Sequence, residues 1–325
     1  MAGRFRWAPL LRLLLGLALI AGLVRSIGPE AIRLAGVPVR AHPAGIAAAL
    51  ALTFAALCAG VVRWHVLLRR MGLPTPFSRT FRGYFIGQFF NAFLFGACGG
   101  DLARAVFAAH DHAERRAEAV TSVFLDRAIG LVVTLLIGCA LLVPRLRFFA
   151  GHPEARPALL WTGVFLLATL ACLALFFIRA DVARWPGLRR LAAHGRIGPL
   201  LRRVFEALAF FRQHARHLLA PTLLSIANLL LLAAATAALA RALEMPLAFA
   251  DLLVVFPIIT VLAAVPLTPG SLGVRETLYV QLLHPFGILP GPALMLSLLG
   301  YLAATVWSLF GGLLFLRGSR GPTAK

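Results

Sequence analysis

Two long hydrophobic segments of this chain are interrupted halfway by glycine or proline. The first lies near residues 81–109 and breaks at residues 96–100, and the second lies near residues 250–284 and breaks at residues 266–273. Each resumes at an acidic residue and an arginine. Inside a bilayer, irregular backbone is tolerated only where protein or a water-filled cavity satisfies its amides and carbonyls. The two breaks therefore predict a pair of re-entrant helical hairpins that line a path for a substrate.

The composition places these hairpins in a membrane protein. The 325 residues are 60% hydrophobic and 14% charged, which excludes an ordinary soluble domain. We expect an all-α polytopic protein, a single integral membrane domain over residues 1–325 with no soluble catalytic domain. About six further segments have the length and apolar character to cross a bilayer as full helices. They lie near residues 8–24, 44–62, 120–143, 158–178, 220–240 and 293–315.

The net charge of +20 comes from short basic stretches that flank the apolar runs. Such stretches fit the positive-inside rule and anionic lipid head groups, and we expect no nucleic-acid partner. With the N-terminus inside, most of the arginines fall on the cytoplasmic side, Arg63 and Arg104 among them. If residues 81–109 made a full crossing instead, the arginine-rich loop 179–219 would lie outside. We therefore expect a multi-pass protein of the cytoplasmic or inner cell membrane with both termini cytoplasmic.

The predicted order of elements is span, span, hairpin, span, and it occurs twice. The first copy covers about residues 1–143 and the second about residues 158–317, and the second starts from the opposite side of the membrane. Inverted repeats of this kind are a recurring plan of secondary transporters. Between the spans, apolar side chains in residues 200–216 recur every three or four positions and are interleaved with arginines, which predicts an amphipathic helix on the inner leaflet.

Each break is expected to precede the start of a short helix, where unpaired amides carry partial positive charge. One start is predicted at Gly99 or Gly100 and the other at Ser271 or Gly273, with the glycines letting a ligand approach the backbone. Serine is also a common N-cap residue, so the alternative is that Ser271 only caps the helix and binds no ligand.

Charged side chains follow both breaks. Arg104, Arg127 and Arg275 together would form a site for an anion such as a lipid phosphate. On the alternative interpretation, Asp101 is an N-cap, and Arg104 and Arg275 anchor the chain at the membrane interface.

Asp126 and Arg127 lie inside the third full span, where ionisable groups usually face the bundle interior. Adjacent residues point about 100° apart on a helix, so each needs a partner from another element. Arg275 and Glu276 are the candidate partners, and a purely structural ion pair is the competing account.

Other polar and aromatic residues have local explanations. Asn91 either lines a polar path or caps the bend of the first hairpin, and Trp64 is predicted to lie in the interfacial aromatic belt. His110 and His112 are expected on a solvated loop and not at a metal site, because residues two apart on a helix face different sides. The chain has no nucleophile elbow, phosphate loop or metal-ligand spacing, so neither a cofactor nor a metal is expected.

Three stretches of the sequence resemble the transmembrane region of the lysylphosphatidylglycerol synthase family, also described as a flippase-like family. They are residues 91–104, which end in GGDLAR, residues 123–131, and residues 266–276, which read PLTPGSLGVRE. Phe95 stands where the family usually has proline, and Asp126 stands where the acid is usually glutamate. In fused members this region is joined to an aminoacyltransferase domain, which is expected to be missing here.

The resemblance implies translocation of a lipid with a phosphate-bearing head group, such as an aminoacylated phospholipid, and not its synthesis. Two alternatives stay open: a membrane transferase acting on a polyprenyl-phosphate substrate, with Asp101 or Glu276 as base, and a non-catalytic partner of a separately encoded lipid-modifying enzyme. The expected partners are membrane lipids. The candidate substrate-binding residues are Asn91, Gly99, Gly100, Asp101, Arg104, Asp126, Arg127, Thr268, Pro269, Gly270, Ser271, Gly273, Arg275 and Glu276.

Overall fold

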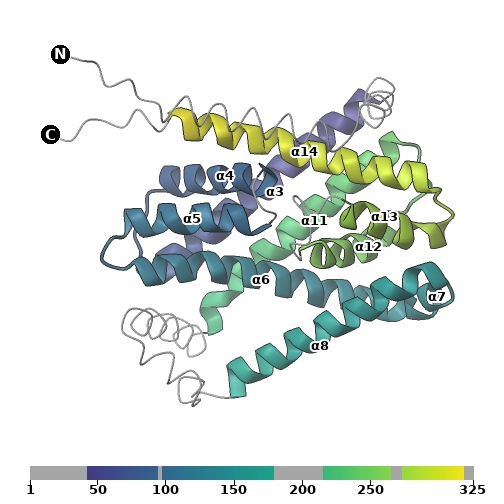
Figure 1. The fold of residues 1–325 in the computed structure, drawn as a ribbon, viewed down its shortest axis with the longest axis horizontal. Coiled ribbons are helices and arrows are strands. Elements are labelled where there is room, and N and C mark those ends of the chain that lie inside the picture. The colour runs from purple at the N-terminus through teal and green to yellow at the C-terminus, as the bar shows by residue number, and fades with distance from the viewer. Residues whose placement is uncertain (1–41, 94–96, 179–214, 265–272, 318–325) are drawn as a thin grey trace.

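The computed structural model of the chain describes residues 42–93, 97–178, 215–264 and 273–317, and its helices are shown in Figure 1. Within these residues, five helical segments are long and apolar enough to cross a membrane. Their helices are α3 (Pro43–Arg70), α6 (Arg116–Leu142), α8 (Arg156–Ile178), α11 (Leu219–Ala242) and α14 (Pro290–Arg317). They confirm the all-α polytopic fold and match five of the predicted spans. The sixth, near residues 8–24, lies outside the described residues, as does nearly all of the predicted amphipathic helix.

Short helices connect the long ones. The turn from α6 to α8 contains η1 (Val143–Arg145), α7 (Leu146–Ala150) and η2 (Pro153–Ala155). The 3-10 helix η4 (Ala215–Leu218) precedes α11, and η6 (His284–Phe286) leads into α14.

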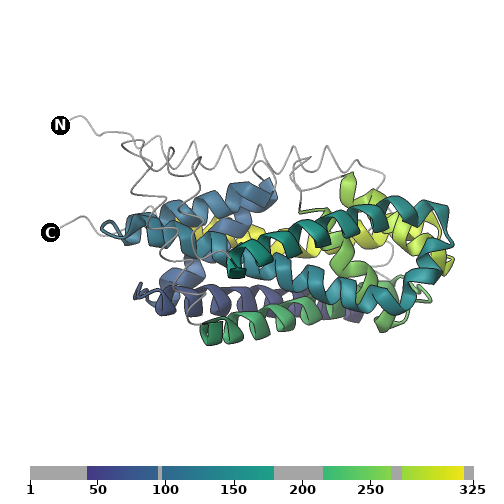
Figure 2. The ribbon, with the colours of Figure 1, turned by 90° about the horizontal axis from the view of Figure 1, so that it is seen from below.

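Both interrupted segments form pairs of short helices. The first pair is α4 (Phe77–Phe93) with α5 (Ala97–Asp111), and the second is α12 (Phe249–Leu262) with α13 (Val274–Leu283). The longest has 17 residues, and at a rise of about 1.5 Å per residue it falls short of a hydrocarbon core of about 30 Å. Along the long axis of the molecule the two pairs occupy opposite halves, as Figures 1 and 2 show.

The helices of the two hairpins pack in matching ways. The first helix of each hairpin contacts the last long helix of the other half, α4 against α14 and α12 against α6. The second helix of each contacts the long helix that follows it, α5 against α6 and α13 against α14. In the centre, α3 packs along α11. This is the arrangement that an inverted repeat produces, and the limits of the two repeats stay a prediction.

Glycines allow the two crossed contacts at corresponding positions. A Cβ at Gly311 of α14 would overlap the carbonyl of Phe85, and a Cβ at Gly138 of α6 would lie 2.8 Å from the Cβ of Pro257. Phe85 is the ninth residue of α4 and Pro257 the ninth of α12. Each hairpin is therefore held at the same depth by a glycine of the opposite half.

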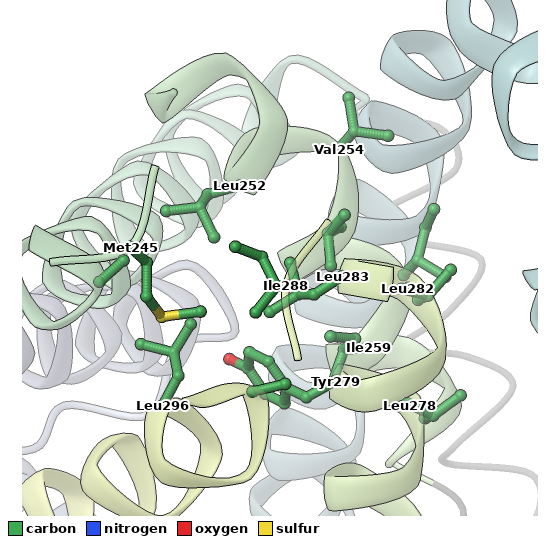
Figure 3. Close-up of a cluster of buried hydrophobic side chains, with 14 of the residues drawn as sticks. Met245, Leu252, Val254, Ile259, Leu278, Tyr279, Leu282, Leu283, Ile288 and Leu296 are labelled. Carbon is green, nitrogen blue, oxygen red and sulfur yellow. The ribbon is translucent and has the colours of Figure 1, made fainter. Parts of the chain in front are cut away.

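Each hairpin also has its own apolar core. The cluster around α12 and α13, drawn in Figure 3, includes Leu252, Ile259 and Leu283, which are at most 2% exposed. The cluster around α4 contains Leu67 and Phe85, both fully buried. By contrast, apolar side chains along α8 are largely exposed, as expected of a helix that faces lipid. Both hairpins therefore contribute fully buried side chains to the interior, whereas no large apolar side chain described in α8 is buried.

Candidate functional site

A cavity of about 420 Å³ lies between the two hairpins, and we call it the central cavity. Side chains of both halves line it, from α3, α4, α5 and α6 on one side and from α11, α12, α13 and α14 on the other. Its polar lining residues include Arg63, Gln88, Asn91, Asp101, Arg104, Asp126, Arg127, Ser225, Asn228, Arg275 and Ser297. Six of the predicted site residues, Asn91, Asp101, Arg104, Asp126, Arg127 and Arg275, therefore line one cavity.

Asp126 is the buried centre of the charged lining, at 1% exposure. Its Oδ1 accepts a hydrogen bond of 2.7 Å from Nε of Arg63, and its Oδ2 accepts one of 2.8 Å from Nη2 of Arg104. The expected partners, Arg275 and Glu276, were wrong. Arg63 was also misplaced by the sequence, because it lies inside α3 and not in a cytoplasmic loop, and it donates a further bond of 2.9 Å to Ser225.

Arg104 is enclosed on all sides and is not an interfacial anchor. Its guanidinium lies 4.3 Å from the ring of Trp64 and 4.6 Å from that of Tyr84, which are cation–π contacts. A Cβ at Gly87 would lie 2.5 Å from Cγ of Arg104, so the glycine makes room for this side chain. The Nε of Arg104 is buried and has no hydrogen-bond partner among the residues that the structure describes.

Among the described arginines of the central cavity, Arg127 has the most exposed side chain. Its nearest acidic partner is Asp101, whose Oδ2 lies 3.8 Å from Nε, and the Arg127 side chain is 35% exposed. Asp101 also lies 3.5 Å from Nη1 of Arg104. Asp101 thus lies between two arginines inside α5 and is not the N-cap of that helix. Arg127 is the arginine with most freedom to meet a ligand.

The start of α5 differs from the expectation. The helix begins at Ala97, and the amide of Gly100 donates a bond of 2.8 Å to Oδ1 of Asn91. The space where a Cβ of Gly100 would lie is filled by the carbonyl of Gly87 and by Asn91. Gly100 therefore serves the close packing of α4 on α5, and the predicted approach of a ligand to its backbone was wrong. Asn91 both lines the cavity and caps the bend, while Gly99 lies in the first turn of α5.

The start of α13 is set by Gly273, whose φ of 85° suits glycine. Its amide donates a bond of 2.6 Å to Oε2 of Glu276, which closes the first turn. Oε1 of Glu276 accepts bonds of 2.9 Å from Nη2 of Arg275 and from the hydroxyl of Ser297. Arg275 also lies 4.8 Å from the ring of Tyr301, so it too is no interfacial anchor. The remaining predicted residues of this turn, Thr268, Pro269, Gly270 and Ser271, lie outside the described residues.

Sequence reasoning missed several lining residues. Arg63, Ser225 and Ser297 each sit singly inside an apolar run, and that isolation was the available signal. Trp64 was assigned to the interface, but it is 2% exposed and its Nε1 donates a bond of 3.1 Å to the hydroxyl of Ser122.

The fold and the cavity define a multi-pass helical membrane protein in which two half-length hairpins and the neighbouring spans line a charged cavity. The chain belongs to the family described as the lysylphosphatidylglycerol synthase transmembrane region, whose model matches residues 10–311. This membership confirms the resemblance and places the chain among membrane proteins of lipid metabolism or transport. No curated protein matched the chain in a sequence search.

Proposed function

We propose that this protein moves a lipid with a phosphate-bearing head group across the membrane, with the head group passing through the central cavity. The observation that carries the proposal is a charge imbalance. Among the residues that the structure describes, four arginines line the cavity, Arg63, Arg104, Arg127 and Arg275, and three carboxylates are in contact with them, Asp101, Asp126 and Glu276. Because an uncompensated charge inside a membrane protein is costly, an anionic ligand would balance the excess.

The four arginines differ in how closely they are paired with carboxylates of the protein. Arg63 and Arg104 are bound to Asp126, and Arg275 is bound to Glu276. Within the described residues, Arg127 makes only the longer contact with Asp101. A planar guanidinium binds two phosphate oxygens at once, so Arg127 is the group we assign to the phosphate.

The size and walls of the cavity suit a head group better than a whole lipid. A volume of about 420 Å³ is in the range of small-ligand sites. Apolar side chains such as Leu131, Leu232 and Phe256 also line the cavity. A polar end with a short apolar attachment would therefore meet complementary surfaces, with the acyl chains left in the bilayer.

The test is lipid flipping by the full chain reconstituted in liposomes. Arg127→Ala should slow the flipping of a phosphatidylglycerol by about tenfold or more, since it removes one charge-assisted contact of about 1.5–3 kcal/mol. Arg147→Ala removes an exposed arginine outside the cavity and should leave the rate unchanged. An Arg127→Ala protein that is folded and flips lipid at the wild-type rate would refute the site.

The same liposomes test the alternative of a membrane transferase. The lipid should be recovered chemically unchanged after transport, because translocation makes and breaks no covalent bond. Conversion of a polyprenyl-phosphate substrate by the purified protein, abolished in Asp101→Asn, would support the transferase instead.

A further inference from the structure

A second cavity, of about 230 Å³, lies where α3 and α5 end and α4 begins, and we call it the end pocket. The floor is apolar and comes from Trp64, Leu68, Phe107 and Ala108. Trp64 and Leu68 are at most 2% exposed, so this floor is part of the packed core. Of the predicted site residues that the structure describes, none lines this pocket.

The rim of the end pocket is basic. It carries Arg79, Arg82, His110 and His112, and Asp111 is the one carboxylate that the described residues contribute to it. Asp111 lies 3.9 Å from Nη1 of Arg79, which is a weak contact between exposed groups. Within the described part of the chain, no hydrogen bond or ion pair joins Arg82 to another residue. Arg82 is therefore available to bind an anion from outside the described chain. Basic pockets between membrane helices favour anionic head groups.

The end pocket and the central cavity meet at one pair of side chains. Trp64 lines the end pocket and Arg104 lines the central cavity, and the guanidinium lies 4.3 Å from the indole ring. Trp64 is fixed in this position by its bond to Ser122. At this point the stacked side chains of Trp64 and Arg104 lie between the two cavities.

We propose that the end pocket is a second binding site for a phosphate group that carries a short apolar attachment. Arg79 and Arg82 bind the phosphate, the apolar floor takes the attachment, and Trp64 forms the wall toward the central cavity. This proposal deepens the proposed function, because the same chemistry would be recognised first at the end of the helices and then in the central cavity.

The experiment is a binding titration of the delipidated, purified full chain with dioctanoyl phosphatidylglycerol. The wild-type protein should bind two molecules per chain. The double variant Arg79→Ala/Arg82→Ala should bind one, or should bind the second at least tenfold more weakly. Arg116→Ala is the matched control, since Arg116 is an exposed arginine at the start of α6 that lines neither cavity, and it should still bind two.

A steric variant tests the pocket without changing charge. Gly83 lines the end pocket, and a Cβ there would lie 3.5 Å from the ring of Trp64, which is ordinary contact. Gly83→Leu should therefore fill the pocket and remove the second molecule. Full occupancy of two sites in both the double variant and Gly83→Leu would overturn the proposal.

Competition identifies the source of the phosphate. Inorganic phosphate and glycerol phosphate should displace the lipid from the end pocket at similar concentrations if the ligand is a soluble phosphate. A lipid that resists displacement identifies a membrane head group. If the binding of neither the lipid nor the soluble phosphates depends on Arg79 and Arg82, the pocket binds no phosphate and the proposal is wrong.

The two proposals fail in different ways. If the wild-type chain binds one lipid and the Arg127→Ala chain binds none, the end-pocket proposal is wrong and the site in the central cavity stands. If the chain binds two lipids but flips none in liposomes, the proposed transport function is wrong and both binding sites stand.

Discussion

Arg63 and Asp126 are joined by a hydrogen bond of 2.7 Å between Nε and Oδ1, which ties α3 to α6 in the interior of the molecule. Because Arg104 binds the other carboxylate oxygen over 2.8 Å, Asp126 also ties α5 to the same point. One carboxylate thus fixes the first hairpin against two full spans.

Asp126→Asn should destabilise the protein strongly, because it removes the carboxylate charge that binds the buried Arg63 and Arg104. Among the described residues, Arg104 then keeps only the longer ion pair with Asp101. Breaking a buried pair in this way costs about 3–5 kcal/mol. The free energy of unfolding in mixed micelles measures the effect. Asp126→Glu keeps the charge and should cost less than the amide.

Asp111→Asn is the control for this measurement. Asp111 lies 3.9 Å from Arg79 and is far more exposed than Asp126, so its loss should change stability by less than about 1 kcal/mol. Equal effects of the two substitutions would contradict the central role of Asp126.

Gly311→Ala should also be destabilising, by about 1–3 kcal/mol, since the new methyl group would overlap the carbonyl of Phe85. The obstacle is backbone, which has no rotamer with which to move away. Gly163→Ala in α8 is the matched control, because no atom of the described chain lies within 4 Å of a Cβ there. A Gly311→Ala protein as stable as the Gly163→Ala protein would show that α4 does not approach α14 this closely.

Arg127→Ala and Arg104→Ala should differ in which property they affect. Arg104 is 5% exposed and bound to Asp126, so its removal should lower stability by more than 2 kcal/mol. Arg127 is a third exposed, and its one ion pair with a described residue is the 3.8 Å contact with Asp101, so its loss should cost less than about 1 kcal/mol while weakening lipid binding. Unfolding and lipid titration of the same two preparations separate these effects, and equal destabilisation would contradict the assignment of Arg127 to the ligand.

The sequence predicted the helices well because their signal is local. The apolar run of α14 and the glycine break before Asp101 are visible in the chain itself, and the five described spans lie where hydropathy placed them. The break also pointed to Asn91 and Arg104, which do line the central cavity.

The pairing of charges could not be predicted, because it depends on contacts between distant segments. Arg63 and Asp126 are 63 residues apart, and nothing in either segment specifies the other. Trp64 was misassigned for a related reason, since α3 continues to Arg70 and carries the tryptophan into the core beside Ser122. Gly100 was misread because a glycine that admits a ligand and one that admits a neighbouring helix look alike in sequence.

Side-specific labelling of single cysteines tests most directly whether the hairpins enter from opposite faces of the membrane. With the native cysteines replaced, one cysteine is introduced at each of four exposed positions, Ser78 and Ala113 at the ends of the first hairpin and Ala250 and Gly291 at the ends of the second. An impermeant thiol reagent should reach Ser78→Cys and Ala113→Cys only from the cytoplasmic face, and Ala250→Cys and Gly291→Cys only from the other face. Labelling of Ser78→Cys and Ala113→Cys from opposite faces would show that the first segment crosses the membrane completely and would contradict the shared cavity.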